Sequence, residues 1–347
     1  MRVDAFDYHL PADRIAQQAR TRGTSRLLVL DRRTGAIEHR RFAELPSLLR
    51  RGDLLVRNDV RVRPARLYGR DAESRLVEIF LLRSLDESLR RWLALARPGR
   101  RAKPGRRVAF DGGTAAEVVD VAEDGTRTVL FDRPLDEPLL ARLGHTPLPP
   151  YIRREPGAPD LPEDRAAYQT VFAREPLAVA APTAGLHFTE TILEEIRARG
   201  VAVADLTLAV GAGTFKPVTA DDTDHHVLPP EDVVLPAETR GAVAAARAEG
   251  RRVIAVGTTV TRSLEAAARR GDDALAGDRR FSTDLFITPG FEFRVLDGLL
   301  TNFHLPRSTL LMLVSAFAGR ENVLAAYESA VREGYLFYSF GDAMLIA

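Results

Sequence analysis

Polar residues and glycines follow four apolar runs of the chain, each with the composition of a buried strand. In sheets built from parallel strands, ligands bind outside the carboxyl ends of the strands. Chemistry is therefore expected in these four segments, which cover residues 180–188, 210–215, 256–265 and 300–306.

Two of these segments carry groups suited to an anion. Gly211 and Gly213 would let backbone amides approach a carboxylate or phosphate, although a tight strand-to-loop turn explains them equally well. Thr258 and Thr259 stand where a strand should give way to a helix, whose first amides favour an anion; helix capping by threonine is the alternative. No G-x-G-x-x-G or G-K-[ST] pattern follows the glycines, which excludes the dinucleotide and P-loop fingerprints.

The titratable residues of these segments allow two interpretations. His187 and His304 each stand between apolar residues, so each is either a hydrogen-bonded core residue or a catalytic group. Arg262 and Glu265 are three residues apart on one helix face, and a solvated ion pair is the simplest explanation. The pair at 225–226 lies near three aspartates, but neighbouring histidines rarely aim at one ion, so no metal site is predicted.

The charge balance limits any attraction to nucleic acid to local clusters. The chain has 49 basic and 48 acidic residues, a net charge of +1. The strongest cluster of basic residues contains no acidic residue. It could either contact the phosphates of a nucleic acid or be a solvated loop. Its six cations are Arg97, Arg100, Arg101, Lys103, Arg106 and Arg107.

Composition excludes several classes of protein. With 45% hydrophobic residues and no cysteine, the 347-residue chain is neither disordered nor held by disulfides, thiolate metal sites or iron–sulfur clusters. The start of the chain lacks an apolar signal core. The longest apolar stretch, 309–319, is far short of the ~20 residues that span a bilayer. A cytoplasmic protein without membrane contact is expected.

Two regions with different orders of secondary structure must position these groups. Six short strand-like runs with tight turns predict a small barrel, over residues 66–70, 76–82, 91–96, 107–110, 115–121 and 126–131. Beyond residue 150, strands and helices alternate, which predicts a largely parallel sheet. There, Thr191 and Glu194 form a capping box for a helix that Gly200 ends, and residues 335–340 are expected to be the last strand.

The fold predicted is therefore α/β, a largely parallel sheet domain with an inserted small six-stranded β-barrel domain. Prolines mark both ends of the insertion, at Pro64 and at 147–150. We expect a discontinuous α/β domain of residues 1–64 and 151–347, interrupted by a barrel domain of residues 65–150.

Read together, these segments resemble one family along the whole chain, the S-adenosylmethionine:tRNA ribosyltransferase-isomerases of queuosine biosynthesis. Nine collinear blocks carry the resemblance: 52–67, 147–152, 164–172, 180–188, 211–218, 253–265, 289–291, 301–310 and 341–344. The family's architecture, an α/β domain interrupted by a barrel, agrees with the proline boundaries.

The resemblance implies an unusual use of S-adenosylmethionine as a substrate and no cofactor. The family transfers and isomerises its ribosyl group onto the 7-aminomethyl-7-deazaguanine of a tRNA, giving epoxyqueuosine, adenine and methionine. Such a site must deprotonate the carbon next to the sulfonium, stabilise the opening ribose and hold the extruded base. The expected partners are S-adenosylmethionine and tRNA, and the expected state is a monomer.

The resemblance also suggests roles for individual residues. His187 and His304 would transfer protons, and Arg262 and Glu265 would orient the ribose or the charged ends. The six cations of residues 97–107 would bind tRNA. The expected substrate-binding residues are Asn58, Arg61, Tyr168, Gln169, Thr183, Gly185, Gly211, Gly213, Thr214, Thr258, Thr259, Asn302 and Asp342.

The sequence departs from the family pattern at four positions. Ala209 and Pro229 stand where the family has histidines, Asp59 replaces the second of two asparagines, and Leu177 replaces a glycine. The general base and the acceptor therefore stay open. The alternatives to the queuosine enzyme are a diverged homologue that uses S-adenosylmethionine on a different acceptor, and a non-catalytic tRNA-binding relative.

Overall fold

The computed structural model describes residues 1–211, 218, 220–271 and 277–347, and these residues divide into two compact units. Unit 1 contains residues 1–61, 169–175 and 181–347, and unit 2 contains residues 62–168 and 176–180. The chain passes between them four times, within β4 (Val60–Val62) and β12 (Glu175–Ala178) and at residues 168–169 and 180–181. Residues 151–168 thus group with the inserted unit, whereas the sequence placed its end at residue 150.

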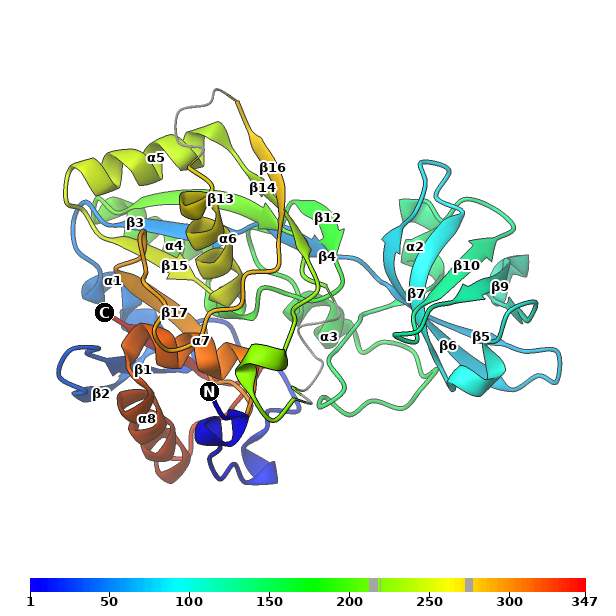
Figure 1. Cartoon of the computed structure of the whole chain (residues 1–347), viewed down its shortest axis with the longest axis horizontal. Coiled ribbons are helices and arrows are strands. Elements are labelled where there is room, and N and C mark those ends of the chain that lie inside the picture. Colours follow the sequence, from blue (N-terminus) through cyan, green and yellow to red (C-terminus); the bar gives the residue numbers. More distant parts are fainter. Residues whose placement is uncertain (212–217, 219, 272–276) are drawn as a thin grey trace. The chain divides into compact units, whose positions relative to one another are not determined.

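Unit 1 is built on a nine-stranded mixed sheet of order β16-β14-β13-β3-β15-β17-β18-β1-β2 (Figure 1). The neighbouring strands β13, β3, β15 and β17 run parallel to one another, and so do β18 and β1, but β18 pairs antiparallel with β17. Strands β14, β16 and β2 also pair antiparallel with their neighbours. The α/β class is confirmed, and the parallel part is the centre of the sheet. The strands are β1 (Arg26–Leu30), β2 (Ile37–Arg41), β3 (Leu54–Asn58), β13 (Ala202–Leu208), β14 (Glu231–Leu235), β15 (Val253–Val256), β16 (Arg279–Thr283), β17 (Gly298–Asn302) and β18 (Ala343–Ile346).

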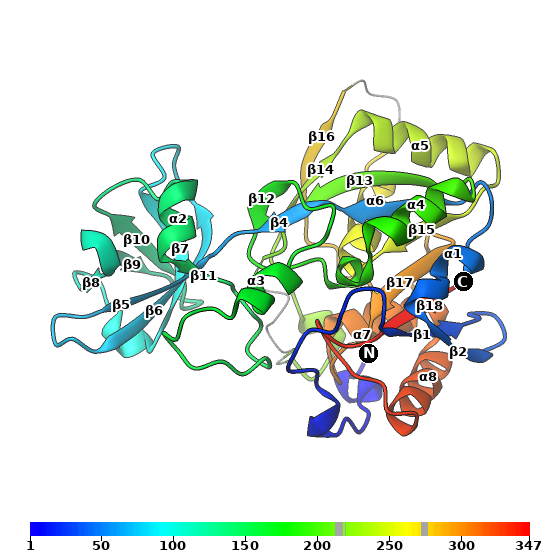
Figure 2. The same ribbon diagram turned by 180° about the vertical axis from the view of Figure 1, so that it is seen from behind.

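Helices cover both faces of this sheet (Figures 1 and 2). Helices α1 and α4 contact each other on one face, whereas α5 and α6 pack against β13, β3 and β15. The helices of unit 1 are α1 (Leu45–Leu48), α4 (Glu190–Ala198), α5 (Ala237–Ala248), α6 (Thr258–Arg269), α7 (Thr309–Ala318) and α8 (Arg320–Arg332), with 3-10 turns η1 (Val3–Phe6), η2 (Ala12–Arg14), η3 (Phe42–Glu44), η6 (Thr183–His187) and η8 (Thr223–His225).

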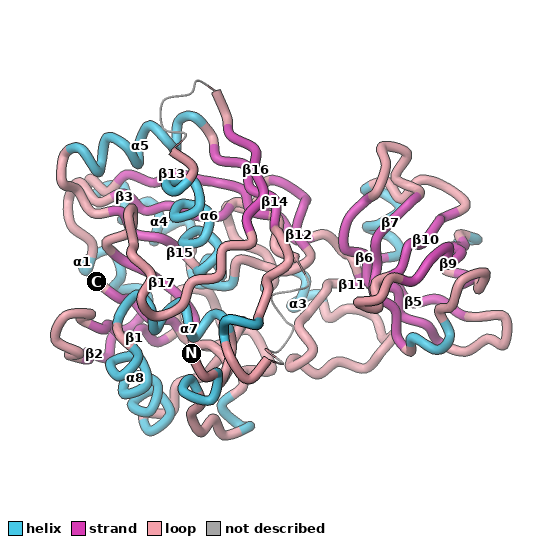
Figure 3. Tube along the Cα trace, in the orientation of Figure 1, coloured by secondary structure: helices cyan, strands magenta, loops and turns pink. Residues whose placement is uncertain are grey.

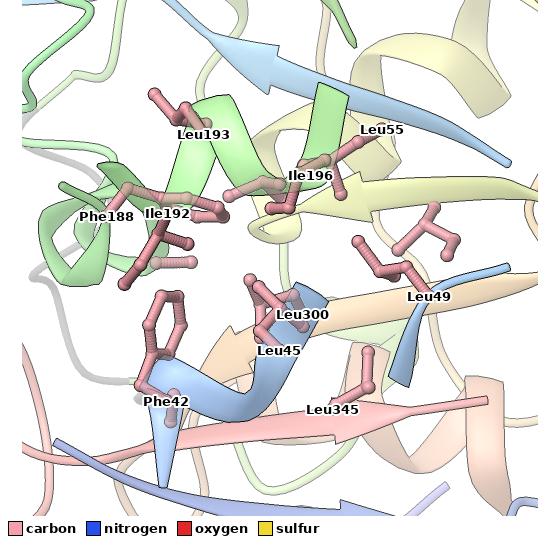
Figure 4. Packing of buried hydrophobic residues seen from close by; sticks show 14 of the residues in the cluster. Phe42, Leu45, Leu49, Leu55, Phe188, Ile192, Leu193, Ile196, Leu300 and Leu345 are labelled. Carbon is pink, nitrogen blue, oxygen red and sulfur yellow. The ribbon is translucent and has the colours of Figure 1, made fainter. Parts of the chain in front are cut away.

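The core between α4 and the sheet is apolar and closely packed (Figure 4). Ile192, Leu193 and Ile196 of α4 meet Leu55 of β3 and Leu300 of β17, and all five side chains are buried. Burial of such side chains contributes roughly 1.5–3 kcal/mol each. This core fixes α4 and the preceding η6 against the carboxyl ends of β15 and β17.

Two local predictions in unit 1 are wrong. Helix α4 begins two residues earlier than predicted, because the Thr189 side chain, and not Thr191, accepts the capping hydrogen bond from the amide of Ile192. Residues 335–340 are not a strand: Tyr338 has a positive φ of 72°, and the amide of Gly341 donates to its carbonyl in a turn. The alternating aromatics there fill a ring cluster with Phe303 and Tyr327. The final strand is β18.

Unit 2 is a closed antiparallel barrel, which confirms the six predicted strands (Figure 3). The sheet order is β5-β6-β7-β10-β9-β8, and a β5–β8 pairing closes it, while the two-residue β11 adds to β5. Gly69 lies at the crowded closure, where a Cβ would come within 2.6 Å of the Ala109 carbonyl. The elements are β5 (Arg66–Arg70), β6 (Leu76–Ser84), β7 (Arg91–Arg97), β8 (Arg107–Ala109), β9 (Ala115–Val121), β10 (Arg127–Phe131), β11 (Gly144–His145), α2 (Glu137–Leu143), α3 (Pro162–Ala167), η4 (Gly99–Arg101) and η5 (Asp111–Gly113).

Candidate active site

The carboxyl ends of the parallel strands bring together segments that are far apart in sequence. Because β3, β13, β15 and β17 run the same way, Asn58, Leu208, Val256 and Asn302 end at one edge of the sheet. The 3-10 turn η6 contacts β17 at this edge. The polar segments that follow these strands, which were predicted to contain the active site, therefore lie at the same edge of the sheet.

His187, the last residue of η6, is buried and has a partner on each ring nitrogen. Its Nδ1 lies 2.9 Å from Ser25 Oγ, and its Nε2 lies 3.2 Å from Asn302 Nδ2. The Phe42 ring lies against the imidazole, with ring centroids 5.1 Å apart. Burial lowers the pKa of His187 to about 4, so the ring is neutral at pH 7.

Asn302 connects His187 to the chain near the C-terminus. Its Nδ2 also donates to the carbonyl of Tyr338 at 2.9 Å. Its Oδ1 is buried and has no hydrogen-bond partner among the residues that the structure describes. A buried acceptor without a donor is unfavourable, so this atom is a candidate contact for a ligand.

His304 lies in a separate aromatic environment just beyond β17. Its Nε2 is 2.8 Å from Thr301 Oγ1, its amide donates to the Tyr327 hydroxyl, and its carbonyl accepts from the Tyr8 hydroxyl. Burial lowers the pKa of His304 to about 3. His304 is therefore also neutral at pH 7.

The start of α6 adjoins η6 at the same edge. Gly257, with φ 96°, donates its amide to the Leu300 carbonyl, and a Cβ on it would lie 3.7 Å from the Ala184 side chain. Thr258 is buried, and Thr259 Oγ1 has no partner within the described part of the chain. The predicted binding residues Thr258, Thr259 and Asn302 thus occupy neighbouring strand ends.

The rest of η6 is fixed by packing. A Cβ on Gly185 would come within 2.8 Å of both Phe172 and Thr170, so this position requires glycine for close approach by the protein itself. Thr183 begins the turn and is half-buried. The glycine at position 185 therefore has a structural explanation that needs no ligand.

Arg262 is held by a buried ion pair that sequence reasoning missed. Its Nη1 contacts Glu231 Oε2, and its Nε donates to the Leu285 carbonyl at 2.9 Å. Glu231 Oε1 accepts from the amide of Gly211 at 3.0 Å. The pair therefore anchors the beginning of the predicted glycine loop, whose Gly213 and Thr214 lie outside the described residues.

A pocket beside this ion pair contains one of the departures from the family pattern. Arg262, Glu231 and Pro229 line it with apolar side chains that include Phe286 and Leu310. Ala209, the other departure, donates its amide to the carbonyl of the residue after Glu231, at 3.0 Å. Both positions where the family has histidine therefore lie around Glu231.

Glu265 faces the backbone of the loop before β17. Its fully buried carboxylate accepts hydrogen bonds from the amides of Arg294, Val295 and Leu296 and from Arg269 Nη1. Arg262 and Glu265 do not form the expected pair. These contacts give Glu265 a structural role, and its catalytic role stays a prediction.

Asn58 and Asp342 are also fully engaged. Asn58 bonds both the amide and the carbonyl of Leu208 through its side chain. Asp342, completely buried, accepts from Arg20 Nη1 and from the amides of Arg26 and Leu336. The Asn58 side chain thus connects the ends of β3 and β13, and the Asp342 side chain connects residues near the two ends of the chain.

The remaining predicted substrate contacts differ in exposure. Tyr168 is completely buried in unit 2, so stacking on its ring would require the covering residues to move. The Gln169 carbonyl, in unit 1, accepts from Arg22 Nη2 at 2.6 Å, and Arg61 is exposed. Their substrate roles stay predictions.

The basic run of unit 2 is ordered around Arg127. This side chain donates to the carbonyls of Gly99 and Ala102, and Arg101 donates to the Leu76 carbonyl at 2.9 Å. Arg101 is half-buried, while the other five cations are exposed, namely Arg97, Arg100, Lys103, Arg106 and Arg107. Within the described chain, none of the six forms a salt bridge.

A metal site and a membrane-spanning helix are both absent from residues 1–211, 218, 220–271 and 277–347. These residues contain no group of three histidine, aspartate or glutamate side chains that could hold a metal ion. They contain no single helix long and apolar enough to cross a membrane, and α7 with α8 reaches that length and apolarity only as a pair bent by 115°.

Comparison with known proteins agrees with this arrangement over the whole chain. The profile of the family described as Queuosine biosynthesis protein matches residues 3–346. The chain belongs to this family. S-adenosylmethionine:tRNA ribosyltransferase-isomerases from Heliobacterium modesticaldum and Moorella thermoacetica are 51% and 49% identical, each aligned over 100% of both chains.

A solved member of the queuosine biosynthesis family has the same fold. The crystal structure of S-adenosylmethionine tRNA ribosyltransferase from Thermotoga maritima superposes with a TM-score of 0.55 at 39% identity, covering 99% of this chain and 100% of that one. The family resemblance drawn from the nine blocks is therefore confirmed.

Ser25, Tyr338 and Glu231 were not predicted as part of the site. Ser25 precedes a hairpin strand and Tyr338 contributes only its carbonyl, so neither carries a pattern that reveals its contact. Glu231 could have been found, because it retains the glutamate of the family pattern that contains Pro229.

Proposed function

We propose that this chain transfers and isomerises the ribosyl group of S-adenosylmethionine onto the 7-aminomethyl-7-deazaguanine of a tRNA. The products are epoxyqueuosine in the tRNA, adenine and methionine. Full-length relatives at about half identity that are named S-adenosylmethionine:tRNA ribosyltransferase-isomerase support this function.

One structural observation carries the proposal. Asn302, η6 with His187 and the start of α6 come from three family blocks far apart in sequence, yet they adjoin at the carboxyl ends of β15 and β17. In an α/β sheet this edge is where a ligand binds. Thr258, Thr259 and Asn302 would contact S-adenosylmethionine there. Gly211, beyond the end of β13, and Arg262 of α6, which are linked through Glu231, would contribute from the far side of β3.

The chemistry requires a proton acceptor near the sulfonium. His187 and His304 are neutral at pH 7, because burial lowers their pKa values to about 4 and about 3. Of the two, His304 is the candidate proton acceptor, because the Nε2 lone pair of His187 faces the Asn302 amide. S-adenosylmethionine is a substrate in this proposal, and no cofactor or metal takes part. The basic run of unit 2 would bind the tRNA backbone.

The test is adenine release, followed by chromatography, from S-adenosylmethionine in the presence and absence of tRNA that carries 7-aminomethyl-7-deazaguanine. Release that depends on this tRNA supports the proposal. S-adenosylmethionine binding without any release, with every tRNA tried, would instead support the diverged homologue. No binding of S-adenosylmethionine together with retained tRNA binding would support the non-catalytic relative.

The two missing histidines sharpen this test. Because both positions lie around Glu231, restoring them as Ala209→His with Pro229→His is expected to raise a slow tRNA-dependent rate. One positioned acid–base group contributes roughly 10²–10⁴-fold. The double variant should exceed the product of the single effects if the imidazoles act together. Wild-type release as fast as that of a relative with both histidines would show that they are dispensable.

A further inference from the structure

The orientation of the Asn302 amide follows from its two hydrogen-bond neighbours, the Tyr338 carbonyl and His187 Nε2. A backbone carbonyl only accepts, so the group 2.9 Å from the Tyr338 carbonyl must be the NH2 end of the amide. The same NH2 group lies 3.2 Å from His187 Nε2, which must therefore present its lone pair. The imidazole proton then stands on Nδ1 and is donated to Ser25 Oγ at 2.9 Å.

The backbone around His187 holds this arrangement in place. The amide of Gly23 donates to the His187 carbonyl at 2.9 Å, and Arg22 Nη1 donates to the Leu186 carbonyl at 3.2 Å. The imidazole itself is confined between Ser25, Asn302 and the Phe42 ring. These contacts hold His187 and Asn302 in their observed orientation.

Asn302 Oδ1 is the atom of this amide that lacks a hydrogen-bond partner in the described part of the chain. It is buried without a donor within the described residues, although both hydrogens of the same amide are used. A buried acceptor without a partner is uncommon in proteins and calls for an explanation, such as a catalytic role or a bound molecule. Asn302 lies two residues beyond Leu300, which pairs with Val256, the last residue of β15 before α6.

We propose that His187 is a positioning residue, which together with the Tyr338 carbonyl holds the Asn302 amide so that Oδ1 accepts a hydrogen bond from a hydroxyl or ammonium group of S-adenosylmethionine. This inference rests on the proposed function for the identity of the ligand. His187 then acts through its lone pair as an acceptor for Asn302, and does not take a proton from the substrate.

Replacing His187 by glutamine or leucine separates positioning from proton transfer. Glutamine can offer Asn302 an acceptor but cannot act as a base, whereas leucine can do neither. We expect His187→Leu to weaken S-adenosylmethionine binding by about 10-fold or more, and His187→Gln to stay within about threefold of wild type in binding and turnover. Calorimetry without tRNA measures the binding. The proposal is overturned if both variants bind normally and both lose turnover alike.

Substrate analogues identify the donor. Asn302→Leu should weaken binding of S-adenosylmethionine by about 10-fold, and the same substitution should have no effect on the analogue that lacks the contacted group. Analogues without the 2′-hydroxyl, the 3′-hydroxyl or the amino group provide the three arms. If Asn302→Leu weakens the binding of each of the three analogues by the same factor as that of S-adenosylmethionine, none of the three removed groups contacts Oδ1. Asn322→Leu, which removes hydrogen bonds to two backbone carbonyls elsewhere, is the control for general damage.

A measurement on the free protein does not depend on the proposed function. The ¹⁵N resonances of His187 should show a protonated Nδ1 and an unprotonated Nε2 at pH 7. In Asn302→Asp, a carboxylate oxygen would face Nε2, and the resonances should change to those of imidazolium. A wild-type proton on Nε2 would overturn the proposal even if the enzyme is active. A wild type that does not bind S-adenosylmethionine would overturn the proposed function while leaving this measurement valid.

Discussion

Two groups of arginines, one in each unit, serve opposite purposes. In unit 1 they pair with acids that are buried or nearly so: Arg57 with Asp205, Arg252 with Asp53, Arg262 with Glu231, and Arg20 with Asp342. In unit 2, the cations of residues 97–107 form no salt bridge with any described residue. Arg97 and Arg107 even lie opposite Glu78 and Glu117 in strand register without an ion pair.

The difference follows from the cost of burying charge. A buried carboxylate is stable only when paired, so these four arginines of unit 1 are fixed by the fold. An exposed cation needs no partner, and a run of them is available to an anionic ligand. The same residue type therefore contributes to folding in one unit and is available for binding in the other.

The largest effect is expected from breaking the buried pair of unit 1. Arg262→Leu would leave the Glu231 carboxylate buried without its cation, which typically costs about 3–5 kcal/mol of unfolding free energy. Arg262→Leu with Glu231→Leu should recover most of that loss, as measured by urea denaturation. A single variant as stable as wild type would mean that the pair contributes nothing to folding.

A second effect concerns the buried histidine of unit 1. The pKa of His187 is about 4 in the folded state, below the ordinary 6.5, so the unfolded state binds a proton first. Stability should fall by about 3 kcal/mol as pH decreases from 6.5 to 4, and this part should be missing in His187→Gln. Denaturation at several pH values measures it, and parallel curves for both proteins would contradict it.

In unit 2, Asp160 allows a corresponding test of how stability depends on pH. Hydrogen bonds from His145 and Thr146 outweigh burial and lower the pKa of Asp160 to about 2. Its contribution is present above about pH 4 and is lost as pH falls through 2. Asp160→Asn should cost about 1–2 kcal/mol at pH 7, allowing for solvent screening, and only a small part of that at pH 2, where about half of the folded protein's carboxyl is protonated. An equal cost at both pH values would exclude the ionised carboxylate as its source.

The smallest effect on stability, and a distinct effect on binding, is expected from the basic run. Replacing Arg100, Lys103, Arg106 and Arg107 by alanine should change unfolding free energy by about 0.5 kcal/mol or less. The slope of log tRNA affinity against log salt should fall by roughly 0.7–0.9 for each phosphate that the variant no longer neutralises.

A matched control removes four exposed cations of unit 1 instead, as alanine variants of Arg33, Arg199, Arg320 and Arg332. The net charge is the same in both quadruple variants. If the two lower the salt slope equally, the basic run has no particular role in tRNA binding and only total charge matters.

Much of the architecture was accessible from the sequence, because its signals are local. Three of the five turns between the barrel strands contain glycines with positive φ, namely Gly105, Gly112, Gly113 and Gly125. Helices α5 and α6 and strand β15 show apolar periodicity and glycine boundaries. The edge strands β14 and β16 were missed. Their sequences, which mix charged and apolar residues, become strands only by pairing with each other and with β13.

The sequence determined the family and the strand ends where polar residues collect, since both are properties of collinear blocks. Only the tertiary structure decided what those residues touch. Arg262 pairs with Glu231 and not with Glu265, because the helix turns Glu265 toward the backbone of residues 294–296. His187 meets Ser25 and Asn302, which lie 162 and 115 residues away, and no local pattern encodes contacts at that separation.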